Sequence, residues 1–163
     1  MDNLKTERPT RKRNRLENHD YSACGAYFIT ICTAKRENHF WEHSKSFADC
    51  PQSVTLSKHG KIVEKAISNI SSVYPALTVD HYVIMPDHIH LLVRIRSDDH
   101  GEPMVAPTIS RVVQQLKGYV TKHIGFPIWQ KLFFDHIIRN RQDYEEHAKY
   151  IYDNPMKYNG QPL

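Results

Sequence analysis

Two runs of residues typical of β-strands lie almost back to back in this chain, at 77–85 and 88–96. Both runs are rich in Val, Ile and Leu, and only Pro86 and Asp87 separate them. Proline and aspartate favour a tight turn, and a turn this short joins antiparallel neighbours. The sequence therefore predicts an antiparallel hairpin, around which the rest of the fold has to be arranged.

The other segments supply further strands and helices. β-branched and aromatic runs indicate strands, and apolar residues at three- and four-residue spacing indicate helices. Ser57 and Gly125 suit a helix N-cap and C-cap, whereas Asn154 before Pro155 is interpreted as a helix-end device. We expect strands at 27–33 and 132–138, helices at 57–71, 110–124 and 142–152, and a surface loop at 97–107.

The resulting order is strand, helix, strand, strand, helix, strand and a final helix. This is the split β-α-β pattern of ferredoxin-like and RRM-like domains, which belong to the α+β class. We expect an antiparallel sheet with helices on one face. At 163 residues the chain suits one domain, placed at 21–163 and preceded by a basic arm at 1–20. This architecture serves several functions, so the site has to decide between them.

The arm at 1–20 concentrates positive charge. Its five clustered basic residues, with almost no apolar neighbours, are Arg8, Arg11, Lys12, Arg13 and Arg15. Such a segment is typical of a flexible arm that neutralises nucleic-acid phosphates, although a solubilising tail has the same composition. The net charge of +4 permits a nucleic-acid partner without establishing one.

Composition also disfavours several classes of protein. No apolar run approaches the roughly 20 residues that span a bilayer, and the N-terminus lacks the apolar stretch of a signal peptide. The 3 cysteines are odd in number and show no Cys-x-x-Cys spacing, which argues against a disulfide framework or a zinc ribbon. We therefore expect a cytoplasmic protein with free thiols and no membrane partner.

His88 and His90 are the first candidates for metal ligands. Alternate side chains of a strand share a face, so both imidazoles project together while Ile89 points the other way. Two imidazoles on one face can bind a single divalent metal. The pair by itself fits half-exposed histidines at a sheet edge equally well.

The helix expected at 110–124 offers a nucleophile. Tyr119 and His123 are four residues apart and lie at the margin of its apolar stripe. A tyrosine hydroxyl, with an ordinary pKa near 10, needs a phosphate polarised by a metal before it can attack. We expect Tyr119 as nucleophile, His123 as third metal ligand and Lys117 as a charge partner for DNA phosphate. The alternative is a tyrosine that merely packs at the core boundary.

Asp135 and His136 are not assigned to the site. Strand alternation places them on opposite faces, so both cannot face one cleft without a bulge.

Taken in order, several segments resemble the HUH endonucleases, and most closely the single-tyrosine transposases associated with repetitive extragenic palindromes in bacteria. His88-Ile89-His90 resembles the histidine pair that defines the group. The resemblance covers roughly 21–158. The segments that carry it are 25–33, 82–92, 116–119, 129–130, 134–140 and 150–155.

This resemblance implies a cut in single-stranded DNA that depends on Mg²⁺ or Mn²⁺. Tyr119 would attack a phosphorus, leaving a 5′-phosphotyrosine link and a free 3′-hydroxyl. The substrates would be DNA hairpins with a short adjacent guide sequence, handled near the bacterial nucleoid by a monomer acting in cis in preference to a dimer. Many members carry a glutamine four residues after the nucleophile, and this chain has His123 there.

Three alternatives stay open at this point. A non-catalytic RRM-like module would stack bases on sheet aromatics such as Tyr27 and Tyr82. A metal phosphoesterase would activate water and form no covalent link. A domesticated transposase would bind repeat hairpins without moving DNA.

Overall fold

The computed structural model describes residues 25–42, 54–96 and 107–158. The expected arm at 1–20 and most of the loop expected at 97–107 lie outside these ranges. The elements are β1 (Gly25–Cys32), the short 3₁₀ turn η1 (Ala34–Arg36), α1 (Lys58–Ser68), α2 (Ile70–Val73), β2 (Leu77–Ile84), β3 (His88–Ile95), α3 (Ile109–Ile124), β4 (Phe134–Ile138) and α4 (Arg141–Lys157).

The four strands form one antiparallel sheet in the order β2-β3-β1-β4. This is the strand order of the split β-α-β arrangement, so the expected fold class is confirmed. The hairpin between β2 and β3 is closed by a hydrogen bond of 2.8 Å from the Met85 N–H to the His88 carbonyl. Thr30 of β1 lies opposite His90 of β3 in the register.

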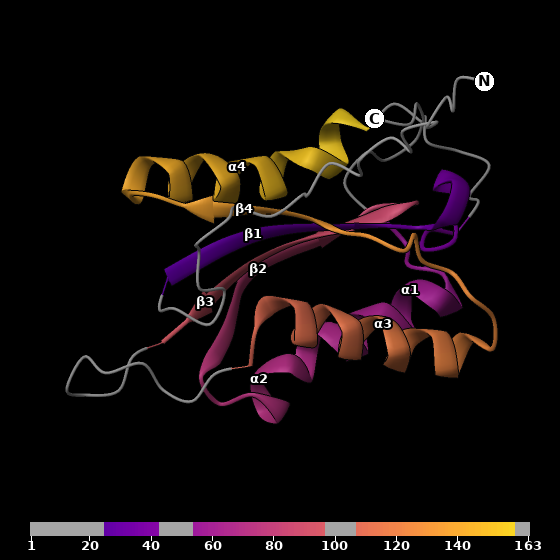
Figure 1. Ribbon diagram of the computed structural model, residues 1–163. Coiled ribbons are helices and arrows are strands. Elements are labelled where there is room, and N and C mark those ends of the chain that lie inside the picture. Colours follow the sequence, from indigo (N-terminus) through magenta and orange to yellow (C-terminus); the bar gives the residue numbers. More distant parts are fainter. Residues whose placement is uncertain (1–24, 43–53, 97–106, 159–163) are drawn as a thin grey trace, which may run out of the picture.

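One face of the sheet packs on α1, α2 and α3 (Figure 1). Alternate residues of the central strands point to this face and are almost completely buried, among them Ile29, Ile31, Ile89 and Leu91. Burying each of these side chains stabilises the fold by about 1.5–3 kcal/mol. The same alternation sends His88 and His90 to the opposite face.

The expected helix ends at Ser57 and Gly125 are confirmed. The Ser57 hydroxyl accepts a hydrogen bond of 3.1 Å from the Gly60 N–H at the start of α1. Gly125 ends α3 with a φ of 94°, a left-handed conformation that glycine adopts without a side-chain clash. The single helix expected at 57–71 is divided at Asn69 into α1 and α2.

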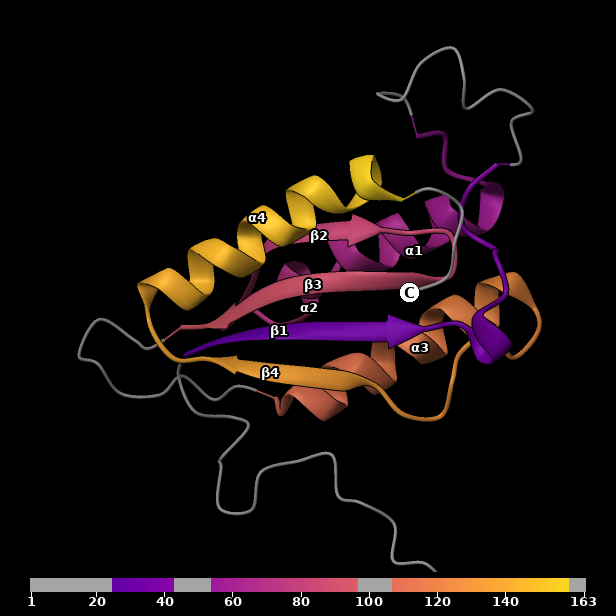
Figure 2. The ribbon, with the colours of Figure 1, turned by 90° about the horizontal axis from the view of Figure 1, so that it is seen from above.

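Helix α4 corrects the expectation that all helices lie on one face. It runs across the side of the sheet opposite to α1 and α3 (Figures 1 and 2). The physical reason is that the second face also carries apolar side chains, such as Phe28 and Leu92, which α4 shields from water. Ile151 of α4 is buried there.

Helix α4 also continues further than expected. It passes through Pro155 and ends at Lys157, whereas the sequence predicts an end at 152. A proline inside a helix gives up its own hydrogen bond to the carbonyl four residues earlier, at Ile151. Packing offsets this loss, because the ring of Tyr158 meets Trp41 edge-on at 5.2 Å and Ile151 and Asn154 are both buried. Within the described ranges, no helix combines the length and apolarity that crossing a membrane requires.

Candidate active site

His88 and His90 converge on one point between the sheet and α4. Both are buried, and their Nε2 atoms lie 3.1 Å apart. The Nδ1 atom of His88 is 2.6 Å from an Asp87 carboxylate oxygen, and Nδ1 of His90 is 2.8 Å from the Thr30 hydroxyl. Partners on both Nδ1 atoms orient the rings and leave both Nε2 atoms to act together, which is the usual arrangement of metal-binding histidines.

The surroundings keep His90 in the form that binds metals. Burial, followed by the charges of His88 and Arg36, lowers the pKa of His90 to about 3. Burial alone would raise the pKa of Asp87, but its hydrogen bond and charge interaction with His88 and the charge of Arg36 outweigh it and hold that pKa below its ordinary value. Neutral His90, next to His88 with its ring oriented by Asp87, is suited to binding a divalent cation.

The turn that carries Asp87 is held by the segment after β1. Thr33 donates to the Asp87 carbonyl through its N–H at 2.8 Å and its hydroxyl at 2.9 Å. The Arg36 guanidinium lies 2.7 Å from the Asp87 carboxylate. Lys35 and Arg36 have φ values of 55° and 59°, a left-handed backbone that costs about 1–2 kcal/mol per residue for side chains of this kind. This strained backbone conformation directs the Arg36 guanidinium to the carboxylate of Asp87, which orients His88.

A pocket of about 390 Å³ opens beside His90. Its lining residues come from β1, β3 and α4 and are Phe28, Thr30, His90, Glu146, His147 and Tyr150. The Tyr150 ring centroid lies 5.3 Å from that of His90, and the Tyr150 side chain is exposed. A tyrosine therefore reaches the histidine pair from α4, with room beside it for a substrate.

Asn154 follows Tyr150 by one helical turn and shares its side of α4. It is buried, and its side-chain Nδ2 has no hydrogen-bond partner among the described residues. One turn later, Tyr158 lies close enough to Asp87 that the carboxylate, after the larger effect of burial, raises the Tyr158 pKa. Asn154 therefore lies along α4 between Tyr150, which contacts His90, and Tyr158, which feels the charge of Asp87.

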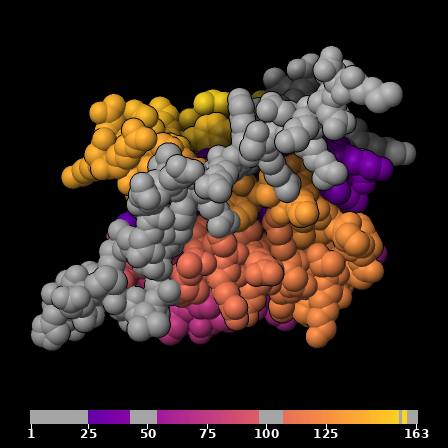
Figure 3. Space-filling model, in the orientation of Figure 1, coloured from indigo at the N-terminus to yellow at the C-terminus, as the bar shows by residue number. Residues whose placement is uncertain are grey.

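The structure does not bring Tyr119 and His123 to the histidine pair. Both belong to α3, which lies under the opposite face of the sheet (Figure 1). Their rings stack at 4.0 Å, and Tyr119 lines a separate groove of about 270 Å³ formed by α1, α2 and α3. In the space-filling view α3 and α4 occupy different parts of the surface (Figure 3). This placement corrects the expected site, because the sheet itself separates Tyr119 from His88 and His90.

Lys117 is occupied within the protein. Its ammonium group donates to the carbonyls of Gln130 at 2.8 Å and Leu132 at 3.1 Å, and burial lowers its pKa. It therefore ties α3 to the segment that precedes β4. The five basic residues of the arm, Arg8, Arg11, Lys12, Arg13 and Arg15, lie outside the described residues.

Sequence reasoning missed Tyr150 and Asn154, although a signal was present. Asn154 comes four positions after Tyr150, the same spacing as the tyrosine and glutamine of many single-tyrosine transposases, and both pairs end in a carboxamide. The interpretation of Asn154 and Pro155 as a helix end concealed this match.

The described sheet offers no open platform of the RRM type. Tyr27 is only 1% exposed and belongs to the core. Phe28 on the other face is covered by α4, where His147 packs on its ring at 4.6 Å. Tyr82 is 40% exposed but lies on the edge strand β2.

Comparison with known proteins identifies two relatives that are named as transposases and one that is uncharacterised. No family model matches the chain. It is 30% identical over 147 residues to a Haemophilus influenzae protein provisionally named REP-associated tyrosine transposase, covering 85% of this chain and 74% of the relative. It is 29% identical over 108 residues to the Escherichia coli REP-associated tyrosine transposase, covering 66% of this chain and 61% of that protein. An uncharacterised H. influenzae protein is 29% identical over 165 residues, which cover 90% of this chain and 88% of that protein.

A solved structure shares the fold. It is that of a REP-associated tyrosine transposase bound to a REP hairpin, with a TM-score of 0.60 and 23% sequence identity. The match covers 89% of this chain and 75% of the other.

Proposed function

The chain belongs to the family of REP-associated tyrosine transposases, and from this premise we propose that it cuts and transfers single-stranded DNA beside a hairpin through a covalent phosphotyrosine link. The observation that carries the proposal is the meeting of a buried histidine pair and an exposed tyrosine at one pocket. The related structure holds a REP hairpin, which supports hairpin DNA as the substrate. An adjacent guide sequence is a further part of the proposal.

His88 and His90 would hold the metal, with Asn154 as the third ligand. Mg²⁺ or Mn²⁺ held there would polarise a phosphate oxygen and would stabilise the charge that develops in the transition state. The protein supplies the orientation: Asp87 and Thr30 fix the two imidazoles, and Arg36 holds Asp87. Ligands on a buried strand keep their spacing without reorganisation.

Tyr150 is the nucleophile in this proposal, in place of Tyr119. Its hydroxyl oxygen loses its proton and attacks the phosphorus. The tyrosine oxygen is then bonded to the phosphate at the 5′ end of the cut strand. The bond to the 3′ oxygen breaks, and that oxygen takes up a proton as the free 3′-hydroxyl. The phosphodiester bond is exchanged for a phosphotyrosine bond, so a 3′-hydroxyl can attack in reverse and rejoin strands.

The basic arm is assigned to the hairpin. Arg8, Arg11, Lys12, Arg13 and Arg15 would neutralise duplex phosphates, which makes binding depend on salt concentration. Lys117 has no part in this assignment, because backbone carbonyls already occupy its ammonium group.

The test uses labelled single-stranded hairpin DNA from the repeats that flank the gene, incubated with Mn²⁺ and separated by denaturing electrophoresis. We expect a protein–DNA adduct with wild-type protein that disappears in Tyr150→Phe and in His90→Ala. It should persist in Tyr119→Phe. Tyr152→Phe is the matched control, since Tyr152 is on the same helix but 78% exposed.

Each alternative gives a different pattern on the same gel. Loss of the adduct in Tyr119→Phe, with Tyr150→Phe active, would restore Tyr119 as the nucleophile. Cleavage that survives both tyrosine substitutions would indicate hydrolysis by metal-activated water. Hairpin binding without cleavage, over the metals and hairpins tried, would indicate a binding module or a domesticated transposase.

A further inference from the structure

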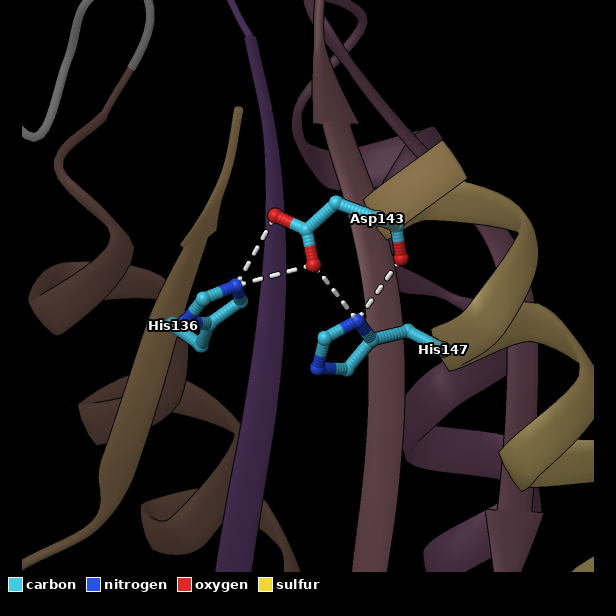
Figure 4. Close-up of side chains that lie close together, drawn as sticks. All are labelled: His136, Asp143 and His147. Atoms are coloured by element: carbon cyan, nitrogen blue, oxygen red, sulfur yellow. Dashed lines mark hydrogen bonds and ion pairs between the residues drawn. The ribbon is translucent and has the colours of Figure 1, made fainter. Parts of the chain in front are cut away.

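A second group of metal-binding side chains lies where β4 leads into α4. His136 is in β4, and Asp143 and His147 are in the first two turns of α4 (Figure 4). One possible ligand atom from each lies within 4.8 Å of the other two. His136 Nε2 is 3.1 Å and 3.0 Å from the two Asp143 carboxylate oxygens, and His147 Nδ1 is 3.1 Å from one of them.

Local structure brings the three together. His136 pairs with Phe28 in the sheet register, and both face α4. Asn140 caps α4 by accepting a hydrogen bond of 2.9 Å from the Asp143 N–H, which fixes the first turn. His147 follows Asp143 by four residues and therefore lies on the same side of the helix. The cluster is thus built from rigid elements and not from a loop.

The carboxylate is kept ionised. A hydrogen bond from the Arg139 backbone N–H, with smaller effects of His136 and His147, outweighs burial and lowers the pKa of Asp143. The Asp143 side chain is 18% exposed, the His147 side chain 24% and the His136 side chain 42%. A metal ion can therefore enter from solvent and still find room for water ligands.

The chemistry of this set selects a class of metal. Imidazole nitrogen together with carboxylate suits Zn²⁺ and related transition-metal dications, whereas Mg²⁺ prefers oxygen ligands. Two ligand atoms on a tetrahedral zinc ion are about 3.3 Å apart, given bonds of about 2.0–2.1 Å. The nitrogen–oxygen separations of 3.0–3.1 Å in the cluster are close to this value.

The cluster is separate from the histidine pair. Phe28 lies between them, with ring centroids 5.1 Å from His90 and 4.6 Å from His147. His136 and His147 stack on each other at 4.7 Å, and of the three cluster residues His147 also lines the pocket beside His90. An ion bound by the cluster would therefore be distinct from one bound by His88 and His90.

We propose that His136, Asp143 and His147 form a second metal site, which takes a transition-metal dication such as Zn²⁺ and fastens the start of α4 to β4. The metal would take the place of the hydrogen bonds and ion pairs that now join the two imidazoles to Asp143. Its consequence for activity rests on the proposed function: α4 carries Tyr150, so fastening its first turns would steady the tyrosine beside His90.

The test measures the number of zinc ions bound per protein in a variant that lacks the His88–His90 site. In a His88→Gln, His90→Gln background, titration with Zn²⁺ against a chromophoric chelator should show one equivalent bound. Adding His136→Gln should weaken that binding at least tenfold. His123→Gln is the matched control, because His123 also bonds through Nδ1 to the carbonyl four residues earlier, at 2.8 Å, as His147 does. Its zinc binding should be unchanged.

A melting experiment gives an independent readout. Zn²⁺ should raise the melting temperature of the background protein by several degrees and leave that of Asp143→Asn unchanged. If the background protein does not fold, wild-type protein replaces it, and His136→Gln should reduce bound zinc from two equivalents to one. Absence of zinc binding, or binding that falls equally in His136→Gln and His123→Gln, would overturn the proposal. Neither readout involves DNA cleavage, so failure here leaves the proposed function intact.

Discussion

Each histidine of the candidate site is held by a neighbour that is not itself a ligand. Asp87 contacts Nδ1 of His88, and Thr30 contacts Nδ1 of His90. Arg36 in turn forms an ion pair with Asp87. A buried imidazole without such partners would be free to rotate away from the metal position. At the residue scale, function therefore depends as much on these orienting contacts as on His88 and His90.

The low pKa of His90 predicts acid sensitivity in metal-free protein. The unfolded chain binds a proton near pH 6.5, whereas folded His90 binds one only near pH 3. The unfolding free energy should therefore fall as pH decreases through this window, by at most about 1.4 kcal/mol per pH unit from this group. Urea denaturation of chelator-treated wild type and His90→Asn measures it. Equal pH dependence in the two proteins would contradict the assignment.

We expect Asn154 to lower the stability of the metal-free protein and to be needed for cleavage. Its unpartnered, buried Nδ2 costs about 1–3 kcal/mol of stability. Asn154→Leu, of similar shape, should leave the unfolding free energy of metal-free protein unchanged or raise it, and should reduce cleavage at least tenfold. Asn154→Asp, which keeps an oxygen at the same place, is the control and should retain part of the activity. A leucine variant that cuts like wild type would exclude Asn154 as a ligand.

At the scale of elements, α4 is the part of the fold that completes the site. It contributes Tyr150 and Asn154 from one side and lies across strands that would otherwise expose Phe28 and Leu92. Its first turn is anchored to the sheet through Tyr144, whose hydroxyl donates to Asp80 at 2.7 Å beside the β-bulge in β2. Small losses of anchoring should therefore affect catalysis before they affect the core.

Tyr144→Phe tests this anchoring. Loss of the hydrogen bond to Asp80 should lower the unfolding free energy by about 1 kcal/mol. Amide hydrogen exchange should become faster in α4 than in α3, since only α4 loses an anchor. Val73, exposed on α2, provides the control Val73→Ala, which should leave exchange in α4 unchanged. Uniformly faster exchange in both helices would show that α4 does not move separately.

At the scale of the whole molecule, one chain provides every side chain of the candidate site. β4 and α4 are joined by Arg139 and Asn140 alone, and Tyr150 lies beside His90 of the same chain. So short a connection leaves little length for α4 to reach a second copy. We therefore expect the site to be built within one chain.

Mixing two inactive variants tests this arrangement. Tyr150→Phe and His88→Ala, each without adduct formation, should remain inactive together, because neither chain holds a complete site. Restored adduct formation in the mixture would show that α4 is exchanged between chains. Mixing each variant with wild-type protein provides the reference for full activity.

Much of this fold follows from local pattern. The hairpin around Pro86 and Asp87, the capped helices beginning after Ser57 and ending at Gly125, and the pairing of His88 with His90 on one face all depend on neighbours in the chain. Turn chemistry and side-chain alternation act over a few residues, so a sequence displays them directly.

What the sequence by itself determined is the order of elements and the identity of the histidine pair, because both arise from short-range spacing. Which helix meets that pair was decided only by the tertiary structure. Tyr119 and Tyr150 both lie on helices with a residue suited to metal binding four positions later, and local spacing cannot tell on which face of a sheet a helix packs. Packing made this choice, because α4 shields the apolar second face of the sheet from water. Burial of Ile151 and the contact of Tyr158 with Trp41 stabilise the continuation of α4 past Pro155. That extension placed Asn154 inside the helix and Tyr150 beside His90.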